Sequence, residues 1–345
     1  MKATNNKHFI SSYVTQLTKI NDTVVQKGKE HSYNIHGQYG HYFYQQDLRT
    51  PFFYMEGLSR IHRKIGKNSV IFENLLKLFK SVEDSFGAYD YWSGFLNLSK
   101  ELKLNEKILK YLNEKFLMTL GTLENRLYSD GWVVPLHGSS FASPCCDEVL
   151  NLLKDTEWSK NDAKENAKML AFFRDEAIKT DLKLRSGEIN INDTEEGVHE
   201  VRRRLRWFPI YRIALQGRLQ FSKYKTGSQL SGYITPKEKS NPFNKQQSCQ
   251  DGISPITIHT GAYMGMSVLI RELGEIKDKA LFYELMENTC RLTGISFKAI
   301  LPKIKNHSLT NQEAVRGAEK LISHFVMKEN GLQILAEHFN KQIKN

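Results

Sequence analysis

Residues 198–218 read VHEVRRRLRWFPIYRIALQGR and carry one histidine and four arginines within eight consecutive positions. Successive residues of a helix are about 100° apart, so four of these cations share one stripe: His199, Arg202, Arg203 and Arg206. The apolar residues occupy a separate arc: Val198, Val201, Leu205, Phe208 and Leu215. Arg204 points away from both and is expected to be solvated. The stretch therefore predicts a helix with one buried apolar face and one cationic face.

The residues around this stretch predict where its helix begins and bends. Asp193 and Glu196 have the spacing of a capping box, and Glu195 adds a further acid where the helix dipole favours negative charge. Pro209 lacks a backbone N–H and predicts a kink near the middle of the helix.

The rest of the chain shows apolar residues at spacings of three and four, which predicts an all-α protein. Helices are expected at 5–28, 36–66, 69–100, 104–128, 145–181, 194–224, 257–281, 283–297, 311–328 and 330–342. Two stretches rich in glycine, proline or serine do not fit a helix: 131–144, a connector, and 226–256, a long loop. We therefore expect one unit over 1–345, with a first helical bundle at 1–130 and a second at 145–345.

The two sides of the connector resemble each other weakly. QQDLRTPFFYMEGLSRI (45–61) aligns with VHEVRRRLRWFPIYRI (198–213), which pairs Asp47 with Glu200 and Arg49 with Arg202. FKSVEDSFGAYD (79–90) and LIRELGEIKD (269–278) follow at similar places. This degenerate repeat predicts two pseudo-symmetric four-helix bundles side by side, with a basic central groove.

The charge balance of the chain favours an anionic partner. Forty-nine Lys and Arg residues against 38 Asp and Glu residues give a formal net charge of +11 at pH 7, which attracts anions over nanometre distances. The N-terminal residues lack an apolar leader, and no run approaches about 18 apolar residues. A cytoplasmic protein without a membrane partner is the expectation.

The four cysteines predict neither a zinc site nor a disulfide framework, because they include one adjacent pair and no C-x-x-C spacing. They are expected to be reduced thiols. Cys145 and Cys146 follow Pro144 at a predicted helix start, where a thiolate could be stabilised, but ordinary packing is the favoured interpretation.

The cationic stripe is predicted to bind a phosphate chain. Like charges at these spacings repel one another, whereas guanidinium groups bind phosphate oxygens in pairs and His199 adds a donor that becomes cationic near neutral pH. The alternative is a solvated helix face, which usually mixes charges of both signs. A partial counterpart in the first half comprises Arg49, Arg60, Arg63, Lys64 and Lys67. Glu56 interrupts this counterpart, so it is expected to bind less tightly or only to shape the channel.

These residues resemble the conserved histidine α-helical domain (CHAD) family. HEVRRRLR (199–206) is similar to that family's His-x-x-Arg-basic-x-x-basic helix, and LGEIKD (273–278) to its Leu-Gly-x-x-basic-Asp phrase. The resemblance, which spans about 36–340, implies two four-helix bundles flanking a basic channel that binds inorganic polyphosphate. It assigns that role to His199, Arg202, Arg203, Arg206 and Lys277, places Asp278 in the later phrase, and matches Arg49 less closely. Trp207 and Pro209 replace further basic residues of the family, and Gln46 replaces the histidine in the first half.

Other chemistry has less support in the sequence. The chain contains no H-E-x-x-H, Walker A, G-x-G-x-x-G or G-x-S-x-G motif, and no Glu-x-Glu-x-Lys phrase of the triphosphatase domain that often accompanies CHAD proteins. His31, His36 and His41 are spaced too far around a helix to converge on one metal. Three carboxylate pairs could hold Mg²⁺ but are expected to pair with basic residues instead: Glu83 with Asp84, Glu272 with Glu275, and Asp90 with Asp278.

The sequence thus predicts a non-enzymatic binding module for inorganic polyphosphate or a similar polyanion, with no cofactor, catalytic residue or metal. The predicted ligand contacts are His199, Arg202, Arg203, Arg206, Arg49, Arg60, Lys64 and Lys277. A metal-dependent phosphohydrolase is the alternative. RNA binding is a weaker one, in which six aromatic residues would stack bases unless they belong to the core: Tyr42, Phe43, Tyr44, Phe52, Phe53 and Tyr54.

Overall fold

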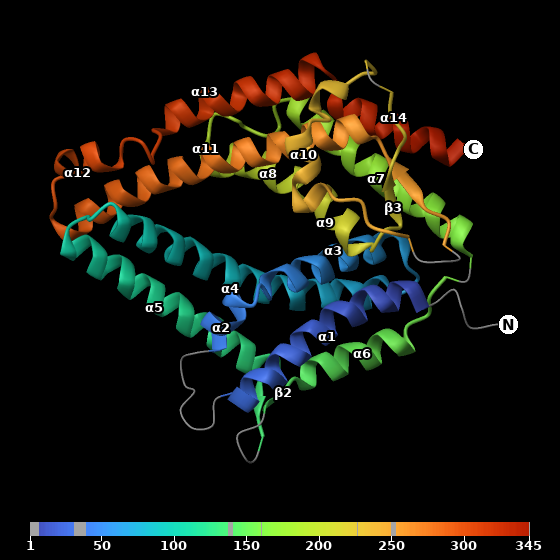
Figure 1. The fold of residues 1–345 in the computed structure, drawn as a ribbon, viewed down its shortest axis with the longest axis horizontal. Coiled ribbons are helices and arrows are strands. Elements are labelled where there is room, and N and C mark those ends of the chain that lie inside the picture. Colours follow the sequence, from blue (N-terminus) through green and yellow to red (C-terminus); the bar gives the residue numbers. More distant parts are fainter. Residues whose placement is uncertain are drawn as a thin grey trace. The chain divides into compact units, whose positions relative to one another are not determined.

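The computed structural model describes residues 7–30, 39–136, 141–159, 161–225, 227–249 and 253–344. The chain divides into two compact units, Met1–Lys160 and Asn161–Asn345. Helices account for 76% of the structure, with almost no sheet, which confirms the prediction of an all-α chain (Figure 1). Among the described residues, none of the helices combines the length and the apolar character needed to cross a membrane.

The first unit is built mainly from long helices packed pairwise. Its elements are α1 (Lys7–Glu30), α2 (Tyr39–Gln45), α3 (Arg49–Ile65), α4 (Ser69–Glu101), α5 (Glu106–Ser129), β1 (Val134–Pro135), β2 (Phe141–Ala142) and α6 (Pro144–Asp155). Helix α4 packs against both α3 and α5, and α1 packs against α3 and α6. Strands β1 and β2 form a short antiparallel pair.

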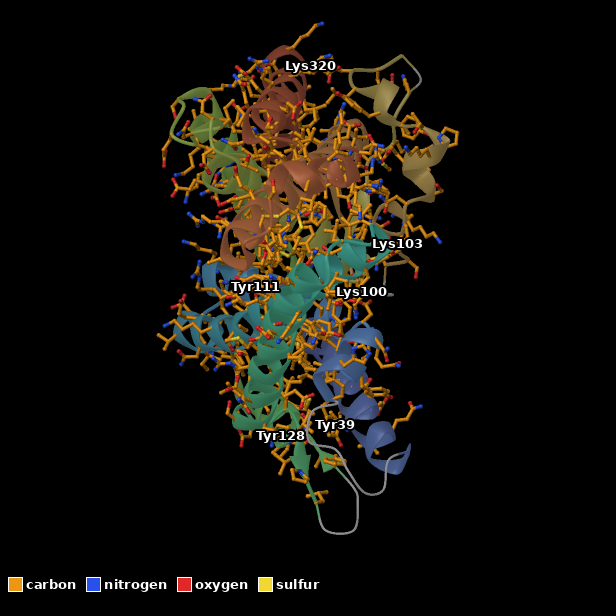
Figure 2. The ribbon with its side chains drawn as sticks, turned by 90° about the vertical axis from the view of Figure 1, so that its left-hand side faces the viewer. Tyr39, Lys100, Lys103, Tyr111, Tyr128 and Lys320 are labelled. Atoms are coloured by element: carbon orange, nitrogen blue, oxygen red, sulfur yellow. The ribbon has the colours of Figure 1, made fainter. Side chains whose placement is uncertain are left out.

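Aromatic side chains fill the core of the first unit. Trp132 is fully buried, and its ring meets that of Phe52 edge-on with centroids 4.8 Å apart. Phe43 is also fully buried. Figure 2 shows the rings of Tyr39 and Tyr128 close together near β1 and β2, with centroids 6.0 Å apart. The aromatic run at 42–54 thus contributes Phe43 and Phe52 to the core.

The second unit combines long helices with short connecting elements. Its helices are α7 (Asp162–Arg185), α8 (His199–Leu205), α9 (Trp207–Ala214), α10 (Pro236–Ser240), α11 (Thr260–Thr293), α12 (Phe297–Ile304), α13 (Asn311–Ile322) and α14 (Gly331–Lys344). Its shorter elements are two π-helical turns, Thr194–Val198 and Ser323–Lys328, two 3-10 turns, Ser231–Tyr233 and Pro242–Asn244, and the strands β3 (Leu219–Phe221) and β4 (Ile256–Ile258). Helix α7 packs on α14, and α11 packs on α8, α13 and α14.

Two buried arginines fasten the long segment between β3 and β4. Arg212 donates to the backbone carbonyls of Phe243 at 3.2 Å and Lys245 at 2.7 Å. Arg218 donates to Oδ1 of Asn166 at 2.9 Å, and Nδ2 of Asn166 donates in turn to the Ser254 carbonyl oxygen of this segment at 2.8 Å. Both arginines are only 1% exposed. The stretch predicted as a loop at 226–256 therefore includes short helical turns and the start of β4, which pairs in parallel with β3.

Several predicted helices are divided where the backbone cannot continue helically. The segment 36–66 breaks at Asp47, which has a φ of 53°. The segment 194–224 breaks at Arg206, because Pro209 has no N–H for the Leu205 carbonyl. This helical segment ends at Ala214, shortly before Gln216 and Gly217 adopt positive φ.

Elsewhere the predicted boundaries between helices shift. The predicted helices 257–281 and 283–297 form the single helix α11, whereas 145–181 divides into α6 and α7. Strands β1 and β2 come from the predicted connector, and α6 packs against α1. The first compact unit thus extends to residue 160, beyond the expected bundle boundary at 130.

Candidate anion-binding site

Helix α8 is positioned by a tight N-terminal turn. The Asp193 carboxylate accepts from the Glu196 N–H at 2.6 Å, as the predicted capping spacing requires. A Cβ atom at Gly197 would lie 2.0 Å from the Asn190 carbonyl oxygen, so only glycine fits this approach. The predicted apolar arc is buried and confirmed: Val198, Val201, Leu205, Phe208 and Leu215.

The guanidinium of Arg202 lies against the middle of α11. Its Nε donates to the Ile270 carbonyl oxygen at 3.2 Å. A Cβ atom at Gly274 would lie 2.9 Å from Nε and 3.3 Å from one terminal nitrogen of Arg202. The glycine in the LGEIKD phrase therefore leaves the space in which Arg202 crosses this helix.

Cationic side chains from two helices converge on His199. Burial, together with the charges of Lys277, Arg206, Arg202 and Arg203, lowers the pKa of His199 to about 4. The Nδ1 atom of His199 is buried and makes no hydrogen bond to the described residues. Three arginines predicted on one stripe thus act together on His199, and α11 contributes Lys277.

The protonation state of His199 differs from the expectation. A pKa of about 4 keeps the imidazole neutral at pH 7, whereas the sequence suggested a cation near neutral pH. Partial burial among positive charges disfavours a further positive charge. In the ligand-free protein, His199 therefore contributes a neutral donor or acceptor.

Two acids of the chain pair with members of this cluster. Glu200 accepts from Nε of Arg203 at 2.7 Å and pairs with Arg204 at 2.6 Å. Lys277 pairs with Asp278 at 2.8 Å. The expectation that Arg204 is merely solvated is wrong. The spacing of Glu200 three and four residues before two arginines was the sequence signal for these pairs.

The cationic residues predicted in the first half are mostly engaged in internal ion pairs. Arg49 donates to Asp90 at 2.7 Å and to Glu83 at 2.9 and 3.0 Å. Arg60 pairs with the buried Glu56 at 2.7 Å.

Two further cations of this group behave in the same way, since Arg63 pairs with Glu73 and Lys67 with Glu157. Lys64 is exposed. Because the chain's own carboxylates bind Arg49 and Arg60, we do not include these two arginines in the candidate site.

The carboxylates considered for Mg²⁺ largely pair with basic side chains, as expected. Besides the two acids on Arg49, Asp84 pairs with Lys80 and Glu272 with Arg271. The described residues contain no group of three or more His, Cys, Asp or Glu side chains able to hold a metal ion. His41 contacts the Tyr89 hydroxyl. His31 and His36 lie outside the described residues.

The cysteines are free thiols. Cys145 and Cys146 stand in the first turn of α6 but are buried. Burial raises the pKa of Cys146 to about 12 and also raises that of Cys145. At these two cysteines, burial raises the thiol pKa more than the start of helix α6 lowers it, in agreement with the interpretation that they are packing residues.

Comparison with protein-family models gave no match, and comparisons with curated proteins and with solved structures gave none either.

Proposed function

We propose that the second unit binds inorganic polyphosphate or a similar polyanion on the surface formed by α8 and α11. The proposed contacts, called the α8–α11 cluster below, are His199, Arg202, Arg203, Arg206 and Lys277. The observation that supports this most directly is the convergence of four cationic side chains around His199, all of which lower its pKa. An anion with several phosphoryl groups would offset that positive potential.

The internal ion pairs in the cluster leave it able to bind phosphate. In the pair between Arg203 and Glu200 the arginine side chain is 53% exposed and the glutamate 17%, and a pair that reaches solvent through its arginine contributes about 0–1 kcal/mol. A phosphoryl group with several charged oxygens competes effectively for such a guanidinium, because planar nitrogen pairs match its geometry. The cluster supplies binding groups, and we assign it no catalytic step.

We also propose the fold that the CHAD resemblance implies, in which two pseudo-symmetric four-helix bundles flank a basic groove. The proposed protein is a cytoplasmic binding module that uses neither a metal nor a cofactor. Support within each unit comes from one shared contact, an arginine lying over a glycine of the longest helix: Arg49 over Gly87 and Arg202 over Gly274.

Replacing Arg202 or Arg206 with alanine is expected to weaken binding of long-chain polyphosphate by about 1–3 kcal/mol each, the scale of a hydrogen bond to a charged group. Direct titration at fixed salt measures the dissociation constant. Arg204→Ala is the matched control, because it removes the same charge from the same helix. Arg204 pairs with Glu200 and acts on Glu188 rather than on His199.

Equal losses of affinity in Arg202→Ala and Arg204→Ala would show that net charge alone attracts the ligand and would reject the α8–α11 cluster. Competition provides a second criterion. At equal phosphate concentration, polyphosphate should displace RNA, whereas the reverse order would favour nucleic acid as the ligand. Release of phosphate with added Mg²⁺ would instead indicate a phosphohydrolase.

Binding is expected to become tighter as the pH falls from 7 towards 4. Burial and the surrounding cations hold the pKa of His199 at about 4 in the free protein, and a bound polyanion offsets the cationic charges and raises this pKa. Protonation therefore accompanies binding between the two pKa values, and affinity rises as the pH falls through that interval. The dissociation constant measured from pH 7.5 to 4.5 reports the effect.

His199→Gln should abolish this pH dependence while leaving much of the affinity at pH 7.5. The matched control is His338→Gln, because the pKa of His338 is also lowered to about 4 but its side chain bonds Thr257. A pH dependence retained in His199→Gln contradicts the assignment. Without ligand, the pKa of His199 is about 4 in the folded protein and about 6.5 in the unfolded chain. The unfolded chain therefore binds a proton first, and the free energy of unfolding decreases as the pH falls from 6.5 towards 4.

A further inference from the structure

We propose that a lysine-rich surface on the segment between β3 and β4 binds the anionic face of a lipid bilayer. This lysine surface consists of five exposed lysines and two exposed aromatic residues: Lys223, Lys225, Lys237, Lys239, Lys245, Tyr224 and Phe243. It shares no residue with the α8–α11 cluster, so the inference goes beyond the proposed function and does not depend on it.

The exposed charges of this segment have a single sign. Between residues 219 and 249 the sequence contains five lysines and one acid, Glu238. Glu238 is 3% exposed and pairs with Arg271 of α11 at 2.5 Å. Lys237 and Lys239, on either side of it, are exposed. The acid is therefore neutralised in the interior, whereas the lysines stand in solvent.

Buried contacts hold the turn that presents Phe243. The Phe243 carbonyl accepts from the Tyr263 hydroxyl at 2.9 Å and from Arg212 at 3.2 Å. The next residue, Asn244, is buried and donates to the Glu238 carbonyl at 2.9 Å. The backbone is thus fixed from inside, while Phe243 itself is 49% exposed. Insertion into a bilayer would remove this ring from water without the cost of ordering the turn.

A second contact joins two stretches of the lysine surface. Nζ of Lys239 donates to the Tyr224 hydroxyl at 2.7 Å and lies 5.3 Å from the centre of its ring. The contact brings residues 223–225 beside α10, which also packs on the turn Pro242–Asn244. Tyr224 is 44% exposed, and tyrosine suits a membrane interface because one end of the side chain is apolar and the other is hydrated.

The residue types favour a bilayer over nucleic acid. Arginine is the cation that best recognises nucleic-acid phosphates through paired nitrogens, and residues 219–249 contain none. Lysine attracts anionic headgroups without a fixed geometry, and an inserted ring adds an apolar contribution. Such peripheral contact needs no membrane-spanning helix. The sequence-based expectation of no membrane partner considered only long apolar segments and therefore did not anticipate it.

Co-sedimentation of the full chain with vesicles tests the proposal. Vesicles of equal parts phosphatidylcholine and phosphatidylserine should bind the protein, and vesicles of phosphatidylcholine alone should not. Lys237→Ser with Lys245→Ser should lower the partition coefficient by about tenfold or more, because each lysine adds to the attraction. Phe243→Ser should lower it by about threefold or more, because the inserted ring is lost. No binding by the natural chain, or undiminished binding by both variants, would overturn the proposal.

Lys164→Ser with Lys320→Ser is the matched control for charge. It removes two exposed lysines of the second unit that each adjoin an acid in sequence, Glu165 and Glu319. The control should change the partition coefficient by less than about threefold, since charges far from the contact are screened by salt. A loss equal to that of Lys237→Ser with Lys245→Ser would show that net charge alone attracts the vesicles, and the lysine surface would be rejected.

Two further outcomes would also reject the proposal. One is binding of polyuridylate that Lys237→Ser with Lys245→Ser abolishes, without any binding to vesicles, which would identify nucleic acid as the partner. The other is a loss of vesicle binding in Arg202→Ala as large as in the double lysine variant, which would assign the lipid contact to the α8–α11 cluster. If the natural chain binds the vesicles but not long-chain polyphosphate, the proposed function fails and this inference stands.

Discussion

Arg49→Ala is expected to lower the free energy of unfolding by about 3 kcal/mol, the lower end of the range for breaking a buried ion pair. The Glu83 side chain is 6% exposed, and Arg49 supplies two hydrogen bonds to it. Without Arg49, this carboxylate remains buried and loses the ion pair and the two hydrogen bonds that Arg49 supplies. Denaturant unfolding of the natural chain and the variant measures the difference.

Arg63→Ala provides the control on the same helix. Its pair with Glu73 is 33% and 37% exposed, so its loss should change stability by less than about 1 kcal/mol. Adding Glu83→Gln to Arg49→Ala should recover part of the lost stability, because the buried group is then neutral. Equal losses in Arg49→Ala and Arg63→Ala, or no recovery, would contradict the assigned role of the buried carboxylate.

The second large effect concerns Phe325, which is 2% exposed. A Cβ atom at Gly331 would lie 2.4 Å from its ring atoms, and one at Gly265 would lie 2.6 Å away. The ring therefore occupies a slot bounded by the backbones of α11 and α14. Phe325→Ala leaves a cavity there and is expected to reduce stability by about 3–5 kcal/mol, as measured by thermal or denaturant unfolding.

A second prediction concerns adding volume to this slot instead of removing it. Gly331→Ala places a methyl group against the Phe325 ring and should reduce stability by about 1–3 kcal/mol. In the Phe325→Ala background, the same change should have little effect, because the space is empty. Gly121→Ala is the control, since no atom lies within 4 Å of its Cβ position, and it should stabilise α5 by up to about 1 kcal/mol. Additive losses in the double variant would show that Gly331 does not contact the ring.

Local spacing predicted the helix at the site well. The apolar arc from Val198 to Leu215 is buried as expected, and Asp193 caps the first turn. The same spacing could have predicted the Glu200 pairs, since they lie within one helical turn. Predictions failed where one residue changed the backbone locally, as at Asp47 and Gln216, because positive φ at a non-glycine residue depends on surroundings distant in sequence.

The sequence by itself determined that the chain is helical, that one helix separates apolar from cationic residues, and that Arg202 belongs to the cationic stripe. These are consequences of a 3.6-residue period acting within one helix. Only the tertiary structure decided that Lys277 joins His199, whereas Glu83 and Asp90 neutralise Arg49. Those partners lie more than thirty positions away along the chain. Which of them meet depends on how two helices pack and in which register, and the period of a single helix does not specify that.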